Sequence, residues 1–248
     1  MNNFTEDEFA LESGSIHYKL RFISEPVFVF IYGGMGDINQ STWNNLIGIL
    51  PHNLSVLTFD RPGIGLSKKS SLSRTAENIA SEVKSLLDYL KFSKYVIIGH
   101  SMGGLYARYL ACKYPDNIIG LVLLDATHED QLIRGSKFYD AKVLKESIKY
   151  ANQNLEGLIV PDDPDKSFEQ MRQFKLLPAN IKSIIAVAEK SLPEQVLNAD
   201  KLNELNILLQ KELSATSSFG KFHQIKDSSH FIYIDQPEIT ANLILSYY

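Results

Sequence analysis

Apolar runs alternate with helical patterns along most of this chain, and the alternation restricts the fold more than any other feature. Runs typical of strands are followed by segments whose apolar residues recur at helical spacing. The predicted strands cover residues 15–22, 27–32, 55–60, 94–100 and 117–125, and the predicted helices cover residues 41–50, 74–90 and 102–113. Strands that alternate with helices form parallel sheets, because right-handed crossovers place helices on both faces. The predicted fold class is therefore α/β, with a mostly parallel, doubly wound sheet.

The alternation stops between residues 126 and 191, where helical patterns are broken by turns and no strand is predicted. It resumes with a strand over 194–199, a helix over 201–213, a strand over 220–225 and a final helix after Asp235. Asp235 and Glu238 have the spacing of a capping box, with Pro237 in the first turn. We predict one core made of residues 1–125 and 192–248, and a helical cap, residues 126–191, inserted into it.

Composition excludes several classes of protein. Apolar residues make up 44% of the 248, which is typical of a large globular domain. The net charge of −4 provides no broad basic surface, so we expect no nucleic-acid partner. Cys112 is the one cysteine, which excludes an internal disulfide and a cysteine-based metal cage. The acidic N-terminus lacks signal-peptide features and no apolar run has membrane-spanning length, so we expect a cytoplasmic protein without a membrane partner.

Ser101 lies between Gly99 and Gly103, at the point where a buried strand becomes a helix. Such a turn holds its central residue in a strained conformation, and neighbouring glycines let strand and helix approach closely. The serine then projects at the helix N-terminus, where unpaired N–H groups and the helix dipole stabilise developing negative charge. This placement suits a nucleophile.

At this point the sequence resembles the α/β-hydrolase family, in the family's order and over nearly the whole chain. The segment GHSMGG contains Ser101, and YGGMGD (residues 32–37) is similar to the family's His-Gly-Gly oxyanion loop. DRPGIGLS (60–67) is similar to the turn after the next strand, and SSHFIYIDQPE (228–238) to the segment of the catalytic histidine. The resemblance implies Ser101 as nucleophile and His230 as its base. The cap would then occupy the place where the family inserts its lids.

The resemblance also implies a carboxylate that completes a catalytic triad with Ser101 and His230, and this acid is harder to assign. The family usually carries it just beyond the strand predicted here near Asn198, but that loop lacks the usual Gly-x-x-Asp, and Leu202 occupies the expected position. Asp200 and Glu204 are nearby candidates. Asp125 ends the preceding strand at the same sheet edge, and some branches of the family draw their acid from there. We prefer Asp125 and retain Asp200 and Glu204 as alternatives.

The resemblance implies an oxyanion hole formed by the backbone N–H groups of Gly34 and Met102, although Tyr32 replaces a histidine that commonly braces the loop. We therefore expect a serine hydrolase that cleaves a small or medium, partly apolar ester or related acyl substrate enclosed by the cap. No cofactor and no metal are expected. The resemblance also admits aminopeptidases, lactonases, C–C hydrolases and acyltransferases, and a non-catalytic ligand receptor on the same fold is an alternative. The sequence does not indicate the oligomeric state.

Overall fold

The computed structural model describes residues 4–34, 43–139 and 163–247. These residues form one sheet of eight strands: β1 Thr5–Ala10, β2 Ser15–Arg21, β3 Val27–Ile31, β4 Ser55–Phe59, β5 Tyr95–His100, β6 Ile118–Leu124, β7 Lys182–Ala188 and β8 Gly220–Ile225. Their order in the sheet is β1-β2-β4-β3-β5-β6-β7-β8. β2 pairs antiparallel with β1 and β4, and every other pairing is parallel. The predicted α/β class with a mostly parallel sheet is confirmed.

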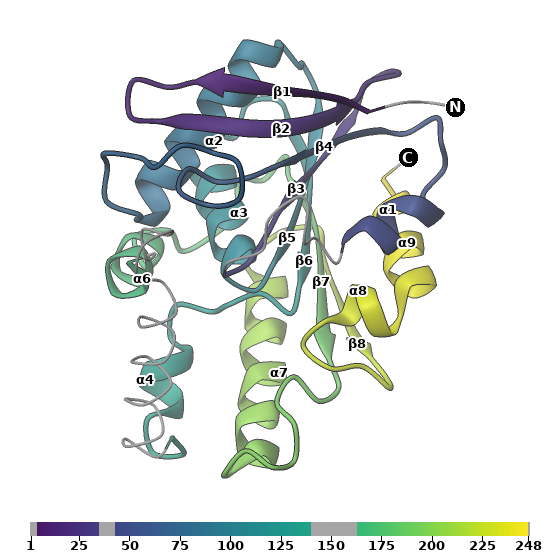
Figure 1. Cartoon of the computed structure of the whole chain (residues 1–248). Helices are drawn as coiled ribbons and strands as arrows, with labels where there is room; N and C mark the ends of the chain where they lie inside the picture. Colours follow the sequence, from purple (N-terminus) through teal and green to yellow (C-terminus); the bar gives the residue numbers. More distant parts are fainter. Residues whose placement is uncertain (1–3, 35–42, 140–162, 248) are drawn as a thin grey trace.

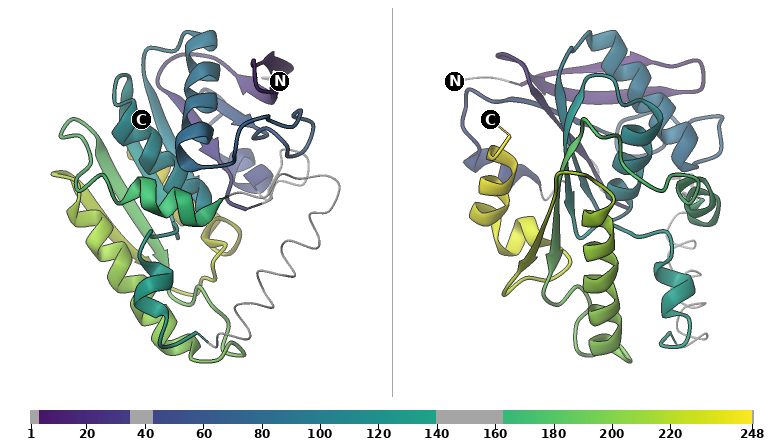
Figure 2. Two further views of the ribbon diagram at one scale, coloured as in Figure 1. Left: turned by 90° about the vertical axis from the view of Figure 1, so that its left-hand side faces the viewer. Right: turned by 180° about the vertical axis from the view of Figure 1, so that it is seen from behind.

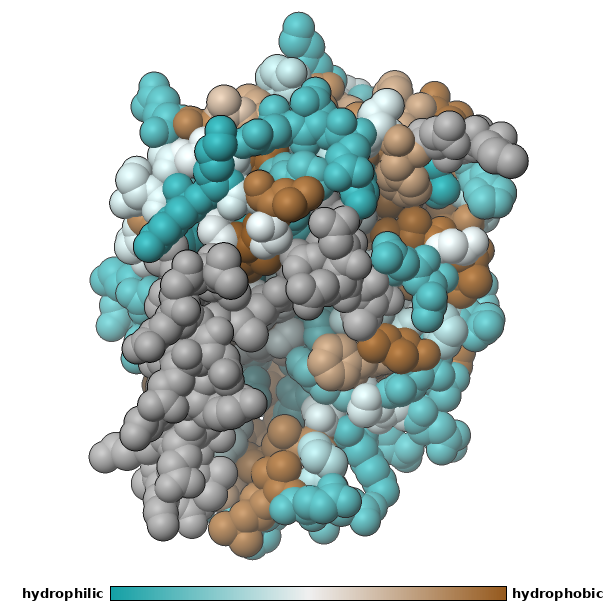
Figure 3. All heavy atoms as spheres, viewed as in Figure 1, coloured by the Kyte–Doolittle hydropathy of each residue, from teal (hydrophilic) through white to brown (hydrophobic). Residues whose placement is uncertain are grey.

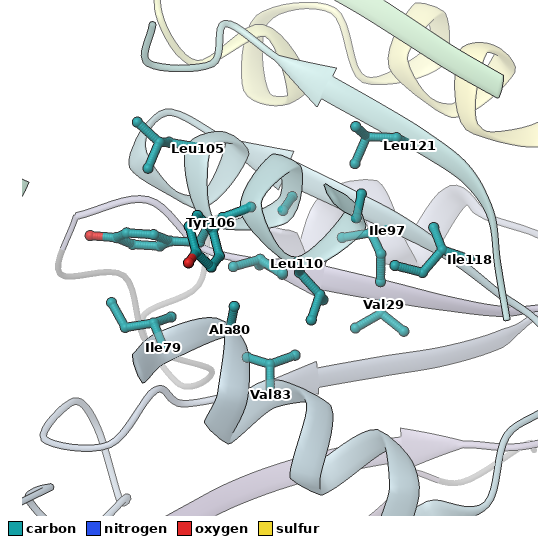
Figure 4. Close-up of a cluster of buried hydrophobic side chains, with 14 of the residues drawn as sticks. Val29, Ile79, Ala80, Val83, Ile97, Leu105, Tyr106, Leu110, Ile118 and Leu121 are labelled. Carbon is teal, nitrogen blue, oxygen red and sulfur yellow. The ribbon is translucent and has the colours of Figure 1, made fainter. Parts of the chain in front are cut away.

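Helices cover both faces of the sheet (Figures 1 and 2). One face carries α1 Trp43–Ile49, α8 Ile232–Asp235 and α9 Pro237–Leu245, and the other carries α2 Ala76–Leu90, α3 Met102–Lys113 and α7 Ala199–Ala215. Each face has its own cluster of buried apolar side chains. Figure 4 shows the cluster in which α2 and α3 meet the sheet, with Val83 and Leu110 facing Val29 and Ile97. The sheet is therefore doubly wound, as predicted.

The strands that lead to the site are those with continuous apolar sequence. Every residue of β3 and β5 is buried, which explains why these segments show no polar alternation. Because β3, β5, β6 and β7 are parallel, their carboxyl ends meet at one edge of the sheet. The turns that follow these strands are thereby gathered in one region.

One predicted strand is wrong. In the predicted range of 194–199, residues 194–198 form turns and residue 199 begins α7, and the strand beside β6 is β7, Lys182–Ala188. All of β7 except Lys182 is buried, so its apolar run belongs to the core. The predicted cap of residues 126–191 therefore includes a strand of the sheet, and a cap has to end before residue 182. The described part of the remaining segment contains α4 Gln131–Gly135 and α6 Pro164–Met171, and residues 140–162 lie outside the described residues. The cap as a separate unit stays a prediction.

The two ends of the chain also differ from expectation. β1 was not predicted, because it is an exposed edge strand with mostly polar residues. The capping box at the last helix is wrong: α9 begins after Gln236, without a side-chain cap, and Asp235 instead accepts hydrogen bonds from the N–H and hydroxyl of Ser229. Pro237 does lie in the first turn.

The surface view shows hydrophilic residues over much of one face, with apolar residues in separate groups (Figure 3). Among the described helices, none is long and apolar enough to cross a membrane.

Candidate active site

The turn between β5 and α3 has the strained geometry that its sequence predicts. Ser101 has φ 54° and ψ −128°, a conformation that L-residues rarely adopt. A Cβ atom on Gly103 would lie 2.2 Å from the carbonyl oxygen of Ile31, and one on Gly99 would lie 2.6 Å from that of Gly103. Both glycines are therefore required by the close approach of β3, β5 and α3. Ser101 is partly exposed at the start of α3.

The glycine turn after β3 packs directly against Ser101. A Cβ on Gly33 would lie 2.6 Å from the Cβ of Ser101 and 3.3 Å from the backbone nitrogen of Met102. Gly34 follows with φ 51°, a value that favours glycine. The Met102 N–H belongs to the first turn of α3, where no intrahelical partner exists. The structure thus brings Gly33, the residue before Gly34, against Ser101 and Met102, and the oxyanion role of Gly34 and Met102 stays a prediction. Residues 35–37 of the same motif lie outside the described residues.

Arg61 holds this glycine turn in place, a role that was not predicted from the sequence. It follows β4, is buried, and donates from Nη2 to the carbonyl oxygen of Gly34. Its guanidinium lies 5.0 Å from the ring centroid of Tyr106 on α3. Tyr32, which replaces the bracing histidine, is buried with its ring 5.9 Å from that of Trp43. The one hint in the sequence is that Arg61 comes directly after a predicted strand. Nothing in the sequence indicates that its side chain reaches Gly34.

His230 and Asp125 are joined by a hydrogen bond of 2.7 Å between Nδ1 and Oδ2. Asp125 directly follows β6 with φ 41°, and its side chain is 1% exposed, whereas the imidazole of His230 is 34% exposed. The bond occupies Nδ1 and leaves Nε2 as the nitrogen available to a hydroxyl. Asp125 is therefore the predicted acid that the structure brings to the histidine.

The alternative acids are elsewhere. Asp200 and Glu204 are both exposed on α7, and within the described residues neither forms a hydrogen bond or ion pair with His230. The loop in which the family carries its acid follows β7, and it presents Ser191, whose hydroxyl donates to Asp125 Oδ1 over 2.9 Å. This loop was predicted too far along the chain, because the strand before it was predicted at residues 194–199 and lies at residues 182–188.

His100 connects Ser101 to His230. Its Nε2 donates to the carbonyl oxygen of His230 over 2.8 Å, and the two imidazole rings are 4.5 Å apart. Burial lowers the pKa of His100 to about 3, with a further contribution from His230. His100 is thus a neutral donor that fixes the backbone of His230. Across the described residues no hydrogen bond joins Ser101 Oγ to His230, and in free hydrolases such bonds are often long until substrate binds.

The sequence is similar to a known family and to several known proteins. The family model described as "alpha/beta hydrolase fold" matches residues 26–226. A Bacillus subtilis (strain 168) protein named "Uncharacterized protein YqjL" is 26% identical over 235 residues, which is 94% of this chain and 88% of that protein. A Mus musculus "Serine hydrolase-like protein" is 28% identical over 133 residues, 53% of this chain and 40% of that protein.

Two solved structures extend the likeness over the whole fold. The mouse alpha/beta hydrolase domain-containing protein 10 has a TM-score of 0.72 at 17% identity, covering 98% of both chains. Carboxylesterase CesB (YbfK) from Bacillus subtilis has a TM-score of 0.72 at 14% identity, covering 99% of this chain and 91% of that one. With the family model matched over most of its length, the chain belongs to the α/β hydrolase fold family.

Proposed function

We propose that the chain is a serine hydrolase that cleaves carboxylic esters or related acyl compounds through an acyl-enzyme on Ser101. The observation that carries the proposal is the 2.7 Å bond between buried Asp125 and His230, beside a serine held at φ 54°. An imidazole held by a carboxylate at Nδ1 serves as general base at Nε2. The mouse relative named as serine hydrolase-like and the carboxylesterase of the same fold support this reading.

The reaction proceeds in two steps of the same tetrahedral geometry. In the first, Ser101 Oγ bonds to the carbonyl carbon while its proton passes to His230, and His230 then gives that proton to the departing alkoxide. In the second, water attacks the acyl-enzyme, its proton passes through His230 to Ser101, and the carboxylic acid leaves. The N–H groups of Gly34 and Met102 hold the oxyanion in both steps. These steps need no cofactor.

The substrate class follows from the surroundings of the site. The proposed substrate is small or medium and partly apolar, bound between the sheet edge and the proposed cap. Phe231 adjoins His230, with ring centroids 5.4 Å apart, and is 45% exposed, so it provides an apolar surface beside the reacting groups. A medium-length acyl chain suits such a surface better than a charged group does.

Labelling with a fluorophosphonate tests the nucleophile. The wild type is expected to react, the Ser101→Ala variant is expected not to react, and Ser81→Ala, an exposed serine on α2, serves as the matched control. Equal labelling of wild type and Ser101→Ala, or no labelling of the wild type, contradicts the proposal. A panel of p-nitrophenyl esters of increasing acyl length then identifies the preferred chain.

The alternative of a non-catalytic ligand receptor had its main support in the atypical acid loop. Since Asp125 provides a carboxylate for His230, no structural observation favours that alternative, and an unlabelled wild type is the result that would restore it.

A further inference from the structure

The two oxygens of the Asp125 carboxylate have different partners. Oδ2 binds His230, whereas Oδ1 accepts three hydrogen bonds: from the Ala188 backbone N–H at 3.2 Å, the Ser191 hydroxyl at 2.9 Å and the Asn206 amide at 3.0 Å. A carboxylate rotates readily about its last torsion, because the two ends are equivalent and the torsional well is broad. Three fixed donors on one side remove that freedom. The other oxygen is then directed at the imidazole.

Asn206 is the centre of this arrangement. Its Nδ2 donates both to Asp125 Oδ1 and, over 2.8 Å, to the hydroxyl oxygen of Ser191. Its Oδ1 accepts from Nε2 of Gln210, one turn further along α7, at 3.4 Å. Nε2 of Gln210 also donates to the carbonyl oxygen of Ala126 over 2.5 Å, the residue after the acid. These contacts leave the Asn206 amide one satisfactory orientation, with its donors toward Asp125.

Asn206 and Gln210 are buried, and a polar side chain at a buried position requires an explanation. Asn206 is 8% exposed and Gln210 is fully buried, on the face of α7 that packs on the sheet. Leucine has a higher helix propensity than asparagine and costs no desolvation at such a position. Two amides in that place are therefore explained by what they bind, which is the acid, its loop and the residue after it.

We propose that Asn206 is a positioning residue that, together with Ser191, orients Asp125 toward His230; the inference rests on the proposed function. Asn206 touches neither nucleophile nor base and acts through the acid alone. Its loss removes one of the three donors to Oδ1 and the side chain that holds the Ser191 hydroxyl. The carboxylate is then held less firmly, so the imidazole spends less time in the orientation that accepts the Ser101 proton. The predicted signature is a fall in kcat with KM unchanged.

The chain offers a matched control on the same helix. Asn203 is 9% exposed, and its side chain makes two hydrogen bonds, against three for Asn206, but both go to the backbone of Leu192. Asn203→Leu therefore removes two side-chain hydrogen bonds on the same helix, one fewer than Asn206→Leu. Comparable losses of Tm are expected from both variants. Only Asn206→Leu removes a donor to the acid.

The test measures kcat and KM for p-nitrophenyl ester hydrolysis in these variants and in an Asp125→Ala background. Asn206→Leu is expected to lower kcat about ten- to a hundredfold, the range for one hydrogen bond to a charged group. Asn203→Leu is expected to change it by less than about threefold. With Asp125 removed, Asn206→Leu has nothing left to position, so its effect on kcat is expected to fall below about twofold.

An equal loss of kcat in both backgrounds overturns the inference, as does an unchanged kcat in Asn206→Leu. The low-field proton resonance of the His230 Nδ1–H gives a second readout that needs no turnover. It is expected in wild type and Asn203→Leu, broadened or lost in Asn206→Leu, and absent in Asp125→Ala. If the wild type shows this resonance but neither hydrolyses esters nor reacts with fluorophosphonate, the proposed function is refuted. The positioning role is then decided by whether the resonance is lost in Asn206→Leu.

Discussion

Replacing Asp125 with asparagine is predicted to move the imidazole proton of His230 from Nδ1 to Nε2 without disturbing the fold. The new side chain has the shape of the old one, but only one of its two ends can accept hydrogen bonds. Two of the three groups that face Oδ1, the Ala188 N–H and the Asn206 amide nitrogen, can only donate. They fix the amide oxygen on their side and turn the amide NH2 toward His230. Nδ1 must then accept, so the imidazole proton moves to Nε2, and the ring cannot take the proton of Ser101.

The loss can be estimated from the chemistry of serine triads, in which the same change costs about 10⁴ in kcat through the wrong tautomer. That factor corresponds to about 5.4 kcal/mol of lost transition-state stabilisation. The hydrogen-bond count on the Oδ1 side is unchanged, so Tm is expected to stay within a few degrees of the wild type. The assay is kcat for a p-nitrophenyl ester, with the fluorophosphonate labelling rate as an independent measure of Ser101 reactivity.

Asp200→Asn and Glu204→Gln are the controls, since these exposed acids on α7 were the alternatives from sequence. Neither is expected to change kcat by more than about twofold, in line with surface substitutions away from a site. If Asp125→Asn retains kcat within tenfold of wild type, or if Asp200→Asn loses as much, the reasoning from tautomer and donor geometry is refuted. A ¹⁵N spectrum of His230 checks the predicted tautomer directly.

Three further substitutions test stability by urea unfolding. Because burial holds the pKa of His100 near 3, far below the ordinary 6.5, its contribution to stability is present above pH 6.5 and is lost as the pH falls, by about 2 kcal/mol at pH 5; His100→Gln should lose that part of the pH dependence. Gly103→Ala places a Cβ 2.2 Å from the backbone oxygen of Ile31 and should cost about 3 kcal/mol, and a stable variant would show that β3 can move. Arg108→Met leaves buried Glu129 without its two hydrogen bonds, at 2.7 and 3.1 Å, and should cost about 3–5 kcal/mol; most of the loss should be recovered in the double variant that also carries Glu129→Met.

The elements that the sequence predicted well are those with strong periodic signals. Buried strands such as β3 and β5 are continuous apolar runs bounded by turns, and the apolar residues of α2 repeat at helical spacing. The Ser101 turn is readable for a similar reason, because two glycines are needed for a chain reversal at close contact and leave a recognisable pattern.

The sequence signal is weaker for a strand whose burial or exposure depends on other parts of the chain. β7 is buried by helices and strands from other parts of the chain, and its run was assigned to a helical segment that surrounds it in sequence. That single error displaced the acid loop and made the atypical residues near 200 look more important than they are. β1 is an exposed edge strand, whose polar residues resemble those of a loop.

The acid could be proposed from sequence but not decided, and the reason lies in how its surroundings are assembled. A carboxylate at the end of β6 becomes the partner of His230 only if its other oxygen is satisfied, since a buried unpaired charge is costly. The donors that satisfy it come from the end of β7, the loop at Ser191 and the middle of α7, segments separated by 63 to 81 residues from Asp125. One of these donors is a backbone N–H, which every residue but proline carries and which leaves no mark in the sequence. The choice between Asp125 and Asp200 therefore depends on which carboxylate the tertiary fold surrounds with donors, and only Asp125 is buried among them.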